Sequence, residues 1–308
     1  MSPAPPLRVG TRASALARTQ TALVTAAIVE LGHKVETVEI VTHGDRSTAA
    51  LTQIGGTGVF VSALRDALLA GEIDVAVHSY KDLPTAPADG LVVAAVPPRE
   101  DPRDVLVARD GLTLGELPPG ARIGTGSPRR AAQVRALGLG VELLPIRGNV
   151  DTRLGKVTSG ELDAVILARA GLARLDRLDV VTETLDPLQV LPAPAQGALA
   201  VECRAGDPLA GVLAALDHAD SRAAVAAERA LLVALEAGCL APIGALAEIV
   251  DDDHGLEIFL RGSVTAADGS DAVRLSATGP MTDAASTGER LAAELVDAGA
   301  NTLMGSGP

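Results

Sequence analysis

Residues 73–82, IDVAVHSYKD, decide the fold because they join a short apolar run to a block of polar side chains. The run from Ile73 to Val77 predicts a buried strand, and the polar block from His78 to Asp82 would be costly to bury unless it lined a cleft. In parallel α/β sheets, ligands bind at the carboxyl ends of strands. The stretch therefore predicts a functional site at a strand end. A solvated loop with a local ion pair between Lys81 and Asp82 is the alternative.

Strands alternate with helices on both sides of this stretch, and the alternation predicts a parallel sheet covered by helices. Ser14 is the expected N-cap of the first helix, whose apolar stripe includes Leu23 and Leu31. The polar stretch from His43 to Thr57 predicts a mobile loop. The predicted elements are strands at Leu7–Thr11, Val35–Val41, Ile73–Val77 and Leu91–Val96, and helices from Ser14 to about Gly32 and at Val59–Leu69.

A second α/β unit lies between two proline-rich crossings, Pro97–Pro102 and Leu191–Pro194. The chain is thus expected to pass from one lobe to another and back, which is a hinge architecture with a cleft between the lobes. A final segment of helix, antiparallel strands and helix predicts a small α+β domain, with a disordered tail after Gly299. The further predicted strands are Val105–Ala108, Arg122–Gly124, Val141–Pro145, Ala164–Leu167, Ala198–Glu202, Ala245–Val250, Leu256–Val264 and Ala272–Thr278, and the helices are Arg130–Leu137, Val150–Ser159, Ser221–Leu235 and Asp283–Val296.

Composition narrows the class of protein. The chain has 308 residues, enough for two or three domains, and a formal net charge of −13. An acidic chain argues against nucleic acid or an anionic membrane as a partner. The N-terminus lacks the features of a signal peptide, and no apolar run approaches the length of a membrane span. Cys203 and Cys239 are far apart in the sequence and do not make a disulfide framework. A cytoplasmic location is therefore expected. The five histidines are scattered, and no metal site is predicted.

Arginine dominates the basic residues. Lys34, Lys81 and Lys156 are the lysines among 26 basic residues, which leaves 23 arginines. The planar guanidinium pairs bidentately with carboxylates and phosphates, and backbone N–H groups at helix starts favour the same anions. A ligand with several such groups is therefore predicted, although a general compositional preference for arginine is the alternative. The arginines at strand ends and helix starts are Arg12, Arg129, Arg130, Arg147 and Arg153.

Cys239 stands on a predicted turn between the helix-ending Gly238 and the helix-blocking Pro242. Such a position suits a nucleophile or a covalent attachment point, provided that a nearby cation lowers the pKa of the thiol. The alternative is a small buried thiol, which is also the expectation for Cys203.

Seven motifs, in this order, closely resemble the hydroxymethylbilane synthase (porphobilinogen deaminase) family from about Leu7 to Val296. Each motif alone is weakly specific, whereas the ordered set is highly specific. The motifs are TRASALA at 11–17, GGTGVF at 55–60, VHSYKDLP at 77–84, GSPRR at 126–130, RGNVDTR at 147–153, QG at 196–197 and GCLAPIG at 238–244.

The resemblance implies two lobes like type II periplasmic binding proteins, joined by a double hinge, plus a small C-terminal α+β domain. Domain 1, the catalytic α/β lobe, would comprise residues 1–97 and 198–217, domain 2, the anion-binding lobe, residues 103–192, and domain 3 residues 219–300. Cys239 in domain 3 would carry a dipyrromethane cofactor through a thioether. Four porphobilinogen molecules would add to this primer, each losing ammonia, and water would release hydroxymethylbilane for tetrapyrrole (heme and porphyrin) biosynthesis. The expected enzyme is a monomeric transferase that binds porphobilinogen and the growing polypyrrole.

The same resemblance assigns roles to individual residues. Asp82 would be catalytic, because its carboxylate can stabilise the cationic azafulvene that porphobilinogen becomes when it loses ammonia. Every pyrrole carries an acetate and a propionate, which accounts for the arginines. Thr57 and Phe60 would belong to a lid, and Thr57 departs from the lysine that many relatives have. Cofactor or substrate binding is implied for Arg12, Ser14, Gln20, Ser79, Lys81, Ser127, Arg129, Arg130, Arg147, Gly148, Arg153, Arg174, Gln196 and Gly197.

A protein of another class remains as the rival. A two-lobed carboxylate-binding protein or sensor without turnover would need the same arginines and the same hinge. Asp82 and Cys239 fit only the enzyme.

Overall fold

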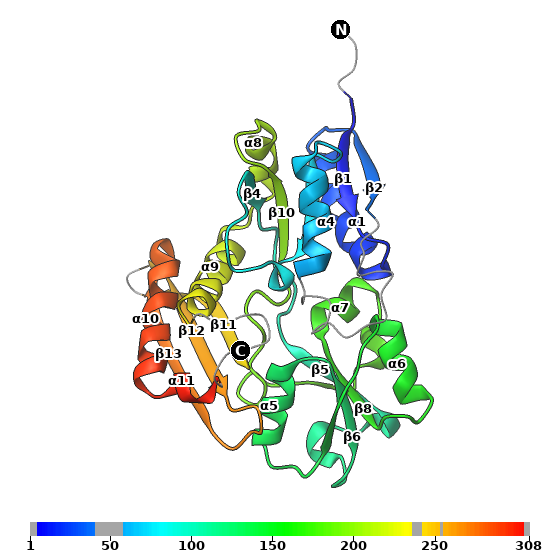
Figure 1. Ribbon diagram of the computed structural model, residues 1–308, viewed down its shortest axis with the longest axis vertical. Helices are drawn as coiled ribbons and strands as arrows, with labels where there is room; N and C mark the ends of the chain where they lie inside the picture. The colour runs from blue at the N-terminus through cyan, green and yellow to red at the C-terminus, as the bar shows by residue number, and fades with distance from the viewer. Residues whose placement is uncertain (1–4, 41–57, 236–241, 253–254, 305–308) are drawn as a thin grey trace. The chain divides into compact units, whose positions relative to one another are not determined.

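The computed structural model describes residues 5–40, 58–235, 242–252 and 255–304 (Figure 1). The chain divides into two compact units, of which the first comprises Met1–Arg99 and Ala198–Arg222, and the second Glu100–Gly197 and Ala223–Pro308. Among the described residues, no helix combines the length and the apolar character that crossing a membrane requires.

The first unit is built on a five-stranded sheet of order β2-β1-β3-β10-β4. Neighbouring strands β2, β1 and β3 are parallel, as expected, but β10 is antiparallel to both β3 and β4. The expectation of an all-parallel sheet is thus wrong for β10, because the returning chain enters this sheet at the edge where β3 ends. The strands are β1 (Leu7–Thr11), β2 (Val35–Glu39), β3 (Val75–Ser79), β4 (Leu91–Ala95) and β10 (Leu199–Arg204).

Helices cover both faces of this sheet. Helix α1 (Ala15–Glu30) and the short α8 (Leu209–Leu213) pack on one face, and α4 (Gly58–Leu69) packs on the other. Ser14 is the N-cap of α1, as predicted, and its Oγ accepts a hydrogen bond from Ala17 N at 3.3 Å. The predicted apolar stripe is partly wrong, because Leu23 and Leu31 are 53% and 41% exposed. The buried face of α1 instead carries Gln20, Thr21, Val24 and Ile28.

The second unit contains another mixed five-stranded sheet, of order β7-β6-β8-β5-β9. Strands β7, β6 and β8 are parallel, and β5 runs antiparallel to β8 and β9. Helix α5 (Pro128–Ala136) packs on one face, while α6 (Val150–Thr158) and α7 (Arg169–Arg174) pack on the other. The strands are β5 (Asp104–Ala108), β6 (Arg122–Thr125), β7 (Glu142–Pro145), β8 (Ala164–Ala168) and β9 (Glu183–Thr184).

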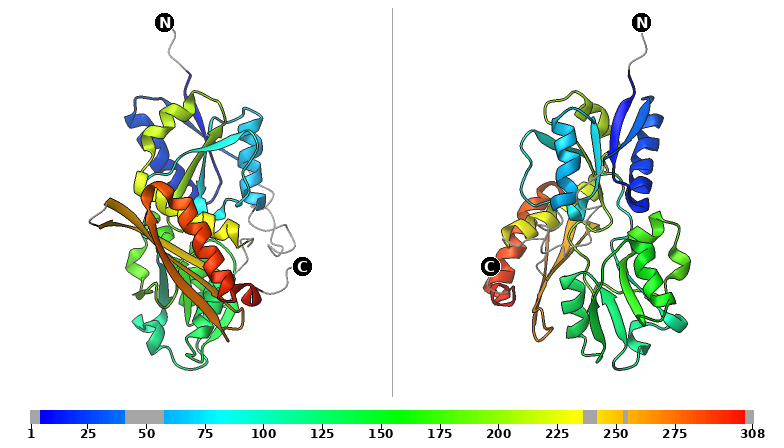
Figure 2. Two further views of the ribbon diagram at one scale, coloured as in Figure 1. Left: turned by 90° about the vertical axis from the view of Figure 1, so that its left-hand side faces the viewer. Right: turned by 45° about the vertical axis from the view of Figure 1, so that its right-hand side comes forward.

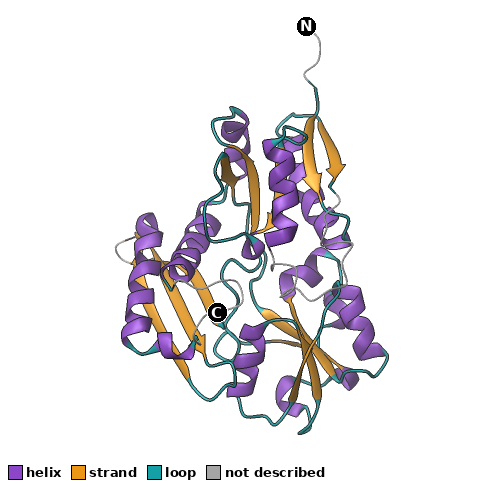
Figure 3. Cartoon of the chain, viewed as in Figure 1, coloured by secondary structure: helices purple, strands orange, loops and turns teal. Residues whose placement is uncertain are grey.

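The C-terminal part of the second unit is an antiparallel sheet of order β11-β12-β13 between helices, as predicted, and the helices pack on one face of it. Figure 2 shows α10 lying along this sheet, and Figure 3 shows its long strands. The expected disorder after Gly299 is wrong as far as residue 304, because α11 follows and Ala300 is fully buried in the core. The elements are α9 (Ala219–Ala234), β11 (Ile243–Asp252), β12 (Gly255–Thr265), β13 (Ala272–Pro280), α10 (Ala284–Asp297) and α11 (Ala300–Leu303).

Candidate functional site

In the first unit, the predicted site residues lie together at the edge of the sheet that is formed by the carboxyl ends of its parallel strands. Strands β1 and β3 are parallel neighbours, so Arg12, directly after β1, and the 3₁₀ helix Tyr80–Asp82, directly after β3, lie at the same edge. Strand β10 starts beside them, since Tyr80 N donates to Ala198 O at 3.0 Å. Lys81 and Asp82 are half-buried. The polar block does reach the end of a strand, but the predicted strand Ile73–Val77 is displaced by two residues, because β3 runs from Val75 to Ser79 and His78 is buried within it at 5% exposed. The catalytic role of Asp82 stays a prediction.

Two further predicted residues shape this edge from helix α1. Gln20 is buried, and its Nε2 donates to Ser79 Oγ at 2.9 Å, which joins α1 to the end of β3. Ser14 caps the helix. The structure thus brings Gln20 and Ser79 together and gives Ser14 a structural role beside them.

Beneath this edge lies a buried charged cluster that sequence reasoning missed. Glu202 on β10 is 2% exposed, and its Oε1 lies 2.8 Å from Arg65 Nη2 of α4. Its Oε2 lies 3.2 Å from His78 Nε2. Burial acts to raise the pKa of Glu202, but the contacts with His78 and Arg65 outweigh it and hold that pKa below its ordinary value. The signal in the sequence was a lone acid in the apolar strand from Leu199 to Cys203.

The second unit repeats the arrangement with different residues. The parallel strands β6, β7 and β8 end side by side, and their carboxyl ends lead into Ser127, into Arg147 and Gly148, and into α7 with Arg174. Ser127 is the N-cap of α5, and its Oγ accepts from Arg130 N at 3.4 Å. Arg147 and Gly148 are exposed, whereas Arg153 and Arg174 are half-buried.

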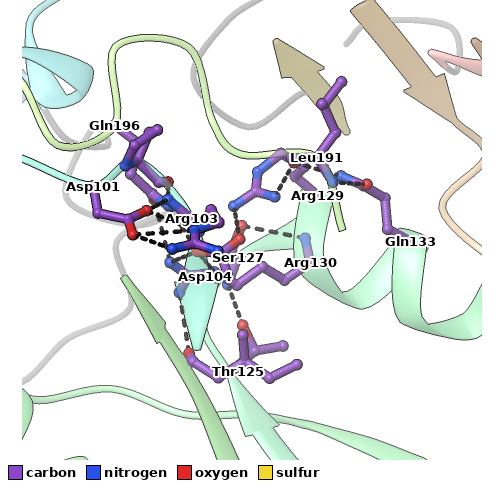
Figure 4. A network of polar contacts seen from close by, with 12 residues as sticks. Asp101, Arg103, Asp104, Thr125, Ser127, Arg129, Arg130, Gln133, Leu191 and Gln196 are labelled. Atoms are coloured by element: carbon purple, nitrogen blue, oxygen red, sulfur yellow. Dashed lines mark hydrogen bonds and ion pairs between the residues drawn. The ribbon is translucent and has the colours of Figure 1, made fainter. Parts of the chain in front are cut away.

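Arg129 and Arg130 are buried on Asp104, a residue that was not among the predicted ones (Figure 4). Arg129 Nη2 lies 2.7 Å from Asp104 Oδ2, and Arg130 Nη2 lies 2.7 Å from Asp104 Oδ1. Further donors reach backbone carbonyls, because Arg130 Nη1 donates to Ile166 O at 3.1 Å and Arg129 Nη1 donates to Leu191 O. Among the described residues, the buried Arg129 Nε has no hydrogen-bond partner. Both arginines therefore belong to the framework of the second unit.

Asp104 is the buried counter-ion of this pair. It is fully buried, and burial acts to raise its pKa, yet Arg129 and Arg130 outweigh burial and hold the pKa well below its ordinary value. Its position could have been noticed in the sequence. The strand Asp104–Ala108 is otherwise apolar, and the period of two places Asp104 on the same face as Leu106, toward α5.

This cluster leaves positive charge in excess, since two guanidinium groups share one carboxylate. Burial lowers the pKa of the nearby Arg153, and the charge of Arg130 lowers it further. Burial also lowers the pKa of Arg174, although Glu100 acts in the opposite direction. An anion at this edge would relieve the repulsion between the cations, so the donors present here fit a ligand with several carboxylates.

Gln196 and Gly197 join the same cluster. Gln196 Nε2 donates to Asp104 Oδ1 at 2.7 Å, and Arg130 Nη2 lies 3.3 Å from Gln196 Oε1. Gly197 O accepts from Arg174 Nη2 at 2.6 Å. Gly197 has φ +88° and a Cβ there would collide with Glu100 O, so both the backbone angle and the space require glycine.

Some predicted residues cannot be placed. Thr57, the loop His43–Thr57 and Cys239 lie outside the described residues, and Phe60 belongs to α4 but its side chain is outside the described part. Cys203, expected to be inert, is fully buried on β10, and burial raises the pKa of its thiol.

Comparison with solved structures gives distant matches. A periplasmic substrate-binding protein of an ABC transporter from Coxiella burnetii matches with a TM-score of 0.43 and 14% identity, over 72% of this chain and 96% of that chain. The α/β class of the chain follows from its own sheets.

Comparison with sequence families gives a specific match. The model described as "Porphobilinogen deaminase, dipyromethane cofactor binding domain" matches residues 7–210, and the model described as "Porphobilinogen deaminase, C-terminal domain" matches residues 222–297. A porphobilinogen deaminase from Mycobacterium tuberculosis is 62% identical over 97% of this chain and 98% of the relative. The one from Mycobacterium ulcerans is 60% identical over 97% of this chain and 96% of the relative. The chain therefore belongs to the porphobilinogen deaminase family.

Proposed function

We propose that the chain condenses four porphobilinogen molecules head to tail on a covalent dipyrromethane primer and releases hydroxymethylbilane. It is a transferase of tetrapyrrole biosynthesis with a dipyrromethane cofactor, as its family membership shows. The observation that supports the binding site is that Ser127, Arg147 and Arg174 follow the ends of the parallel strands β6, β7 and β8, beside the buried pair Arg129 and Arg130. A primer with an acetate and a propionate on each ring would supply carboxylates for these guanidinium groups.

The arginines of the second unit have two different tasks in this proposal. Arg147, Arg153 and Arg174 contact the carboxylates, at about 1.5–3 kcal/mol for each charge-assisted hydrogen bond. Arg129 and Arg130 act mainly through their charge and by holding the binding residues in place, since most of their donors are engaged with Asp104 and backbone carbonyls. The complete set of binding residues proposed is Arg12, Ser14, Gln20, Ser79, Lys81, Ser127, Arg129, Arg130, Arg147, Gly148, Arg153, Arg174, Gln196 and Gly197.

Asp82 is the proposed catalytic residue. It follows β3 at the open edge of the first sheet, on a 3₁₀ helix whose first N–H is tied to Ala198 O. A half-buried carboxylate at this point can face the cationic azafulvene left by the departure of ammonia. An anion held in place against a developing cation lowers the barrier because it needs no reorganisation at the moment of reaction.

Several finer assignments belong to the same proposal. Cys239 is the attachment point of the primer, and Thr57 and Phe60 belong to a lid. The domains are residues 1–97 with 198–217, residues 103–192 and residues 219–300. A hinge between the lobes makes room for the product, and the enzyme acts as a cytoplasmic monomer.

Intact mass spectrometry with a matched pair of cysteine variants tests the proposal. The wild-type chain, expressed with porphobilinogen available, should exceed its polypeptide mass by one dipyrromethane. Cys239→Ala should have the bare mass, whereas Cys203→Ala should keep the adduct, because Cys203 is fully buried on β10. A wild-type chain of bare mass, or an adduct that persists in Cys239→Ala, would refute the assignment.

A further inference from the structure

Residues 191–197 form a buried segment between β9 and β10 that lies entirely within the described part of the chain. Buried backbone groups without a partner are costly, so each needs a hydrogen bond. Side chains supply many of these bonds here. Leu191 N donates to Gln133 Oε1 at 2.7 Å, and Ala195 N donates to Glu228 Oε2 at 2.6 Å. The segment is therefore held by residues that are far from it in the sequence.

Gln133 makes two hydrogen bonds to Leu191, the first residue of this segment. Its Nε2 donates to Leu191 O at 3.1 Å while its Oε1 accepts from Leu191 N, which is the pattern that a neighbouring strand would provide (Figure 4). Gln133 is fully buried on α5. It stands four residues after Arg129, on the same helix face, and Arg129 donates to the same carbonyl. Helix α5 thus carries both the arginines and Gln133, the residue that binds Leu191.

The segment is also joined to β11, the strand that begins after the proposed attachment residue. Ala245 N donates to Pro192 O at 2.9 Å. At Gly244 a Cβ would lie 2.9 Å from Leu191 O and 3.3 Å from Gln133 Nε2, so the strand approaches as closely as glycine allows. Strand β11 begins at Ile243, only four positions beyond Cys239.

Helix α9, which precedes the attachment residue, is joined to the segment as well. Glu228 is fully buried, and it accepts from Ala195 N and, through Oε1, from Ala247 N at 2.8 Å. Ala195 has φ +60°, an unfavourable angle for alanine that its surroundings must enforce. Both elements that flank residues 236–241 therefore contact the same buried segment.

We propose that Gln133 is a positioning residue, which fixes the start of β11 relative to the arginines of α5 through residues 191–192. This inference rests on the proposed attachment of the primer to Cys239. Gln133 would touch neither substrate nor cofactor. Its effect would come from geometry, because a displacement of about 1 Å far from the reacting atoms can cost on the order of 100-fold in rate.

The variant Gln133→Leu tests this proposal, since leucine has a similar size and makes no hydrogen bond. We expect it to load dipyrromethane, as seen by intact mass, but to lose roughly 10- to 100-fold in kcat with little change in KM for porphobilinogen. Hydrogen exchange should also become faster at the amides of Leu191 and Ala245. The control is Ile123→Val, a core change in the sheet under α5 that removes none of these hydrogen bonds.

The outcomes separate this proposal from its alternatives. Normal kcat and slow exchange in a loaded Gln133→Leu protein would overturn it, and so would an equal loss of kcat in Ile123→Val. If Gln133→Leu does not fold, Gln133→Met is unbranched like glutamine and also makes neither hydrogen bond, and normal kcat in that loaded variant would overturn the proposal too. An unloaded wild-type protein would instead refute the proposed function.

Discussion

The polar residues that follow the parallel strands differ in burial between the two mixed sheets. In the first unit, Arg12, Lys81 and Asp82 follow β1 and β3 and remain half-buried, where a ligand could reach them. In the second unit, Arg129 and Arg130 follow β6 but turn inward to Asp104, with exposures of 3% and 6%. A charged motif at a strand end can therefore either stay partly accessible or become part of the buried framework, and its partners decide which.

The reason lies in the partner available to each motif. Asp104 lies under the start of α5 and offers two carboxylate oxygens to the two guanidinium groups. Removing one member of a buried charged cluster leaves the others uncompensated, which is far more costly than removing a solvated charge. The first edge should therefore respond to substitution mainly in rate, and the buried cluster of the second unit mainly in stability.

The largest effect is expected at the first edge. Asp82→Ala should lower kcat on the order of 1000-fold or more, because the carboxylate that stabilises the cationic intermediate is lost. The unfolding free energy should change by less than about 1 kcal/mol, since Asp82 is only half-buried. Steady-state kinetics and denaturant unfolding measure the two quantities. Asp89→Asn, an exposed acid of the same unit, is the control, and near-normal turnover in Asp82→Ala would move the catalytic role elsewhere.

Substitution in the buried cluster of Asp104, Arg129 and Arg130 should affect stability more than rate. Asp104→Asn should lower the unfolding free energy by about 3–5 kcal/mol, because it leaves two buried guanidinium groups without their counter-ion. Denaturant unfolding measures the loss. Asp179→Asn, an exposed acid of the same unit, should stay within about 0.5 kcal/mol of the wild type. A loss below 1 kcal/mol in Asp104→Asn would mean that the pair is not structural.

Among the arginines of the second unit, substitution of an exposed one should weaken substrate binding, and substitution of a buried one should lower stability. Arg147→Ala should raise KM for porphobilinogen roughly 10- to 100-fold, which corresponds to about 1.5–3 kcal/mol, with little effect on unfolding. Arg129→Ala should mainly destabilise the protein, because Arg129 is 3% exposed and paired with Asp104. Arg290→Ala, on the exposed face of α10, should change neither quantity. If Arg147→Ala binds normally, Arg147 is no part of the site.

The smallest expected effect is on the unfolding free energy at acid pH. It can be compared for one carboxylate from each unit, Asp74 and Asp104. The folded pKa of Asp104 is lowered, and that of Asp74, which pairs with Arg8 and Arg204, is lowered to about 2 from 3.8. A lowered folded pKa stabilises the protein above the unfolded value, and this stabilisation is lost as pH falls toward the folded value. The unfolding free energy should thus be insensitive to these groups from pH 8 to about 5 and decrease below about pH 4.

Denaturant unfolding at a series of pH values checks this. Asp104→Asn and Asp74→Asn should each reduce the slope below about pH 4, since neither asparagine titrates. Unchanged slopes in both variants would show that other carboxylates govern acid unfolding.

Much of this protein followed from local patterns in its sequence. Short, mostly apolar runs located β1, β4 and β8 within a residue or so, and Ser14 marked the start of α1. These features are local because strand periodicity and helix capping depend on neighbours along the chain. The ordered motifs also identified the family, which the comparisons confirm.

Only the tertiary structure decided which polar residues face each other. The reversed direction of β10, the Glu202 cluster and the hold of Gln133 on Leu191 join residues that are at least 58 positions apart. The sequence by itself determined where arginines would stand at the strand ends. Whether such an arginine meets a ligand or a buried carboxylate depends on what packing brings opposite it, because a charge is stable in the interior only where a long-range partner compensates it.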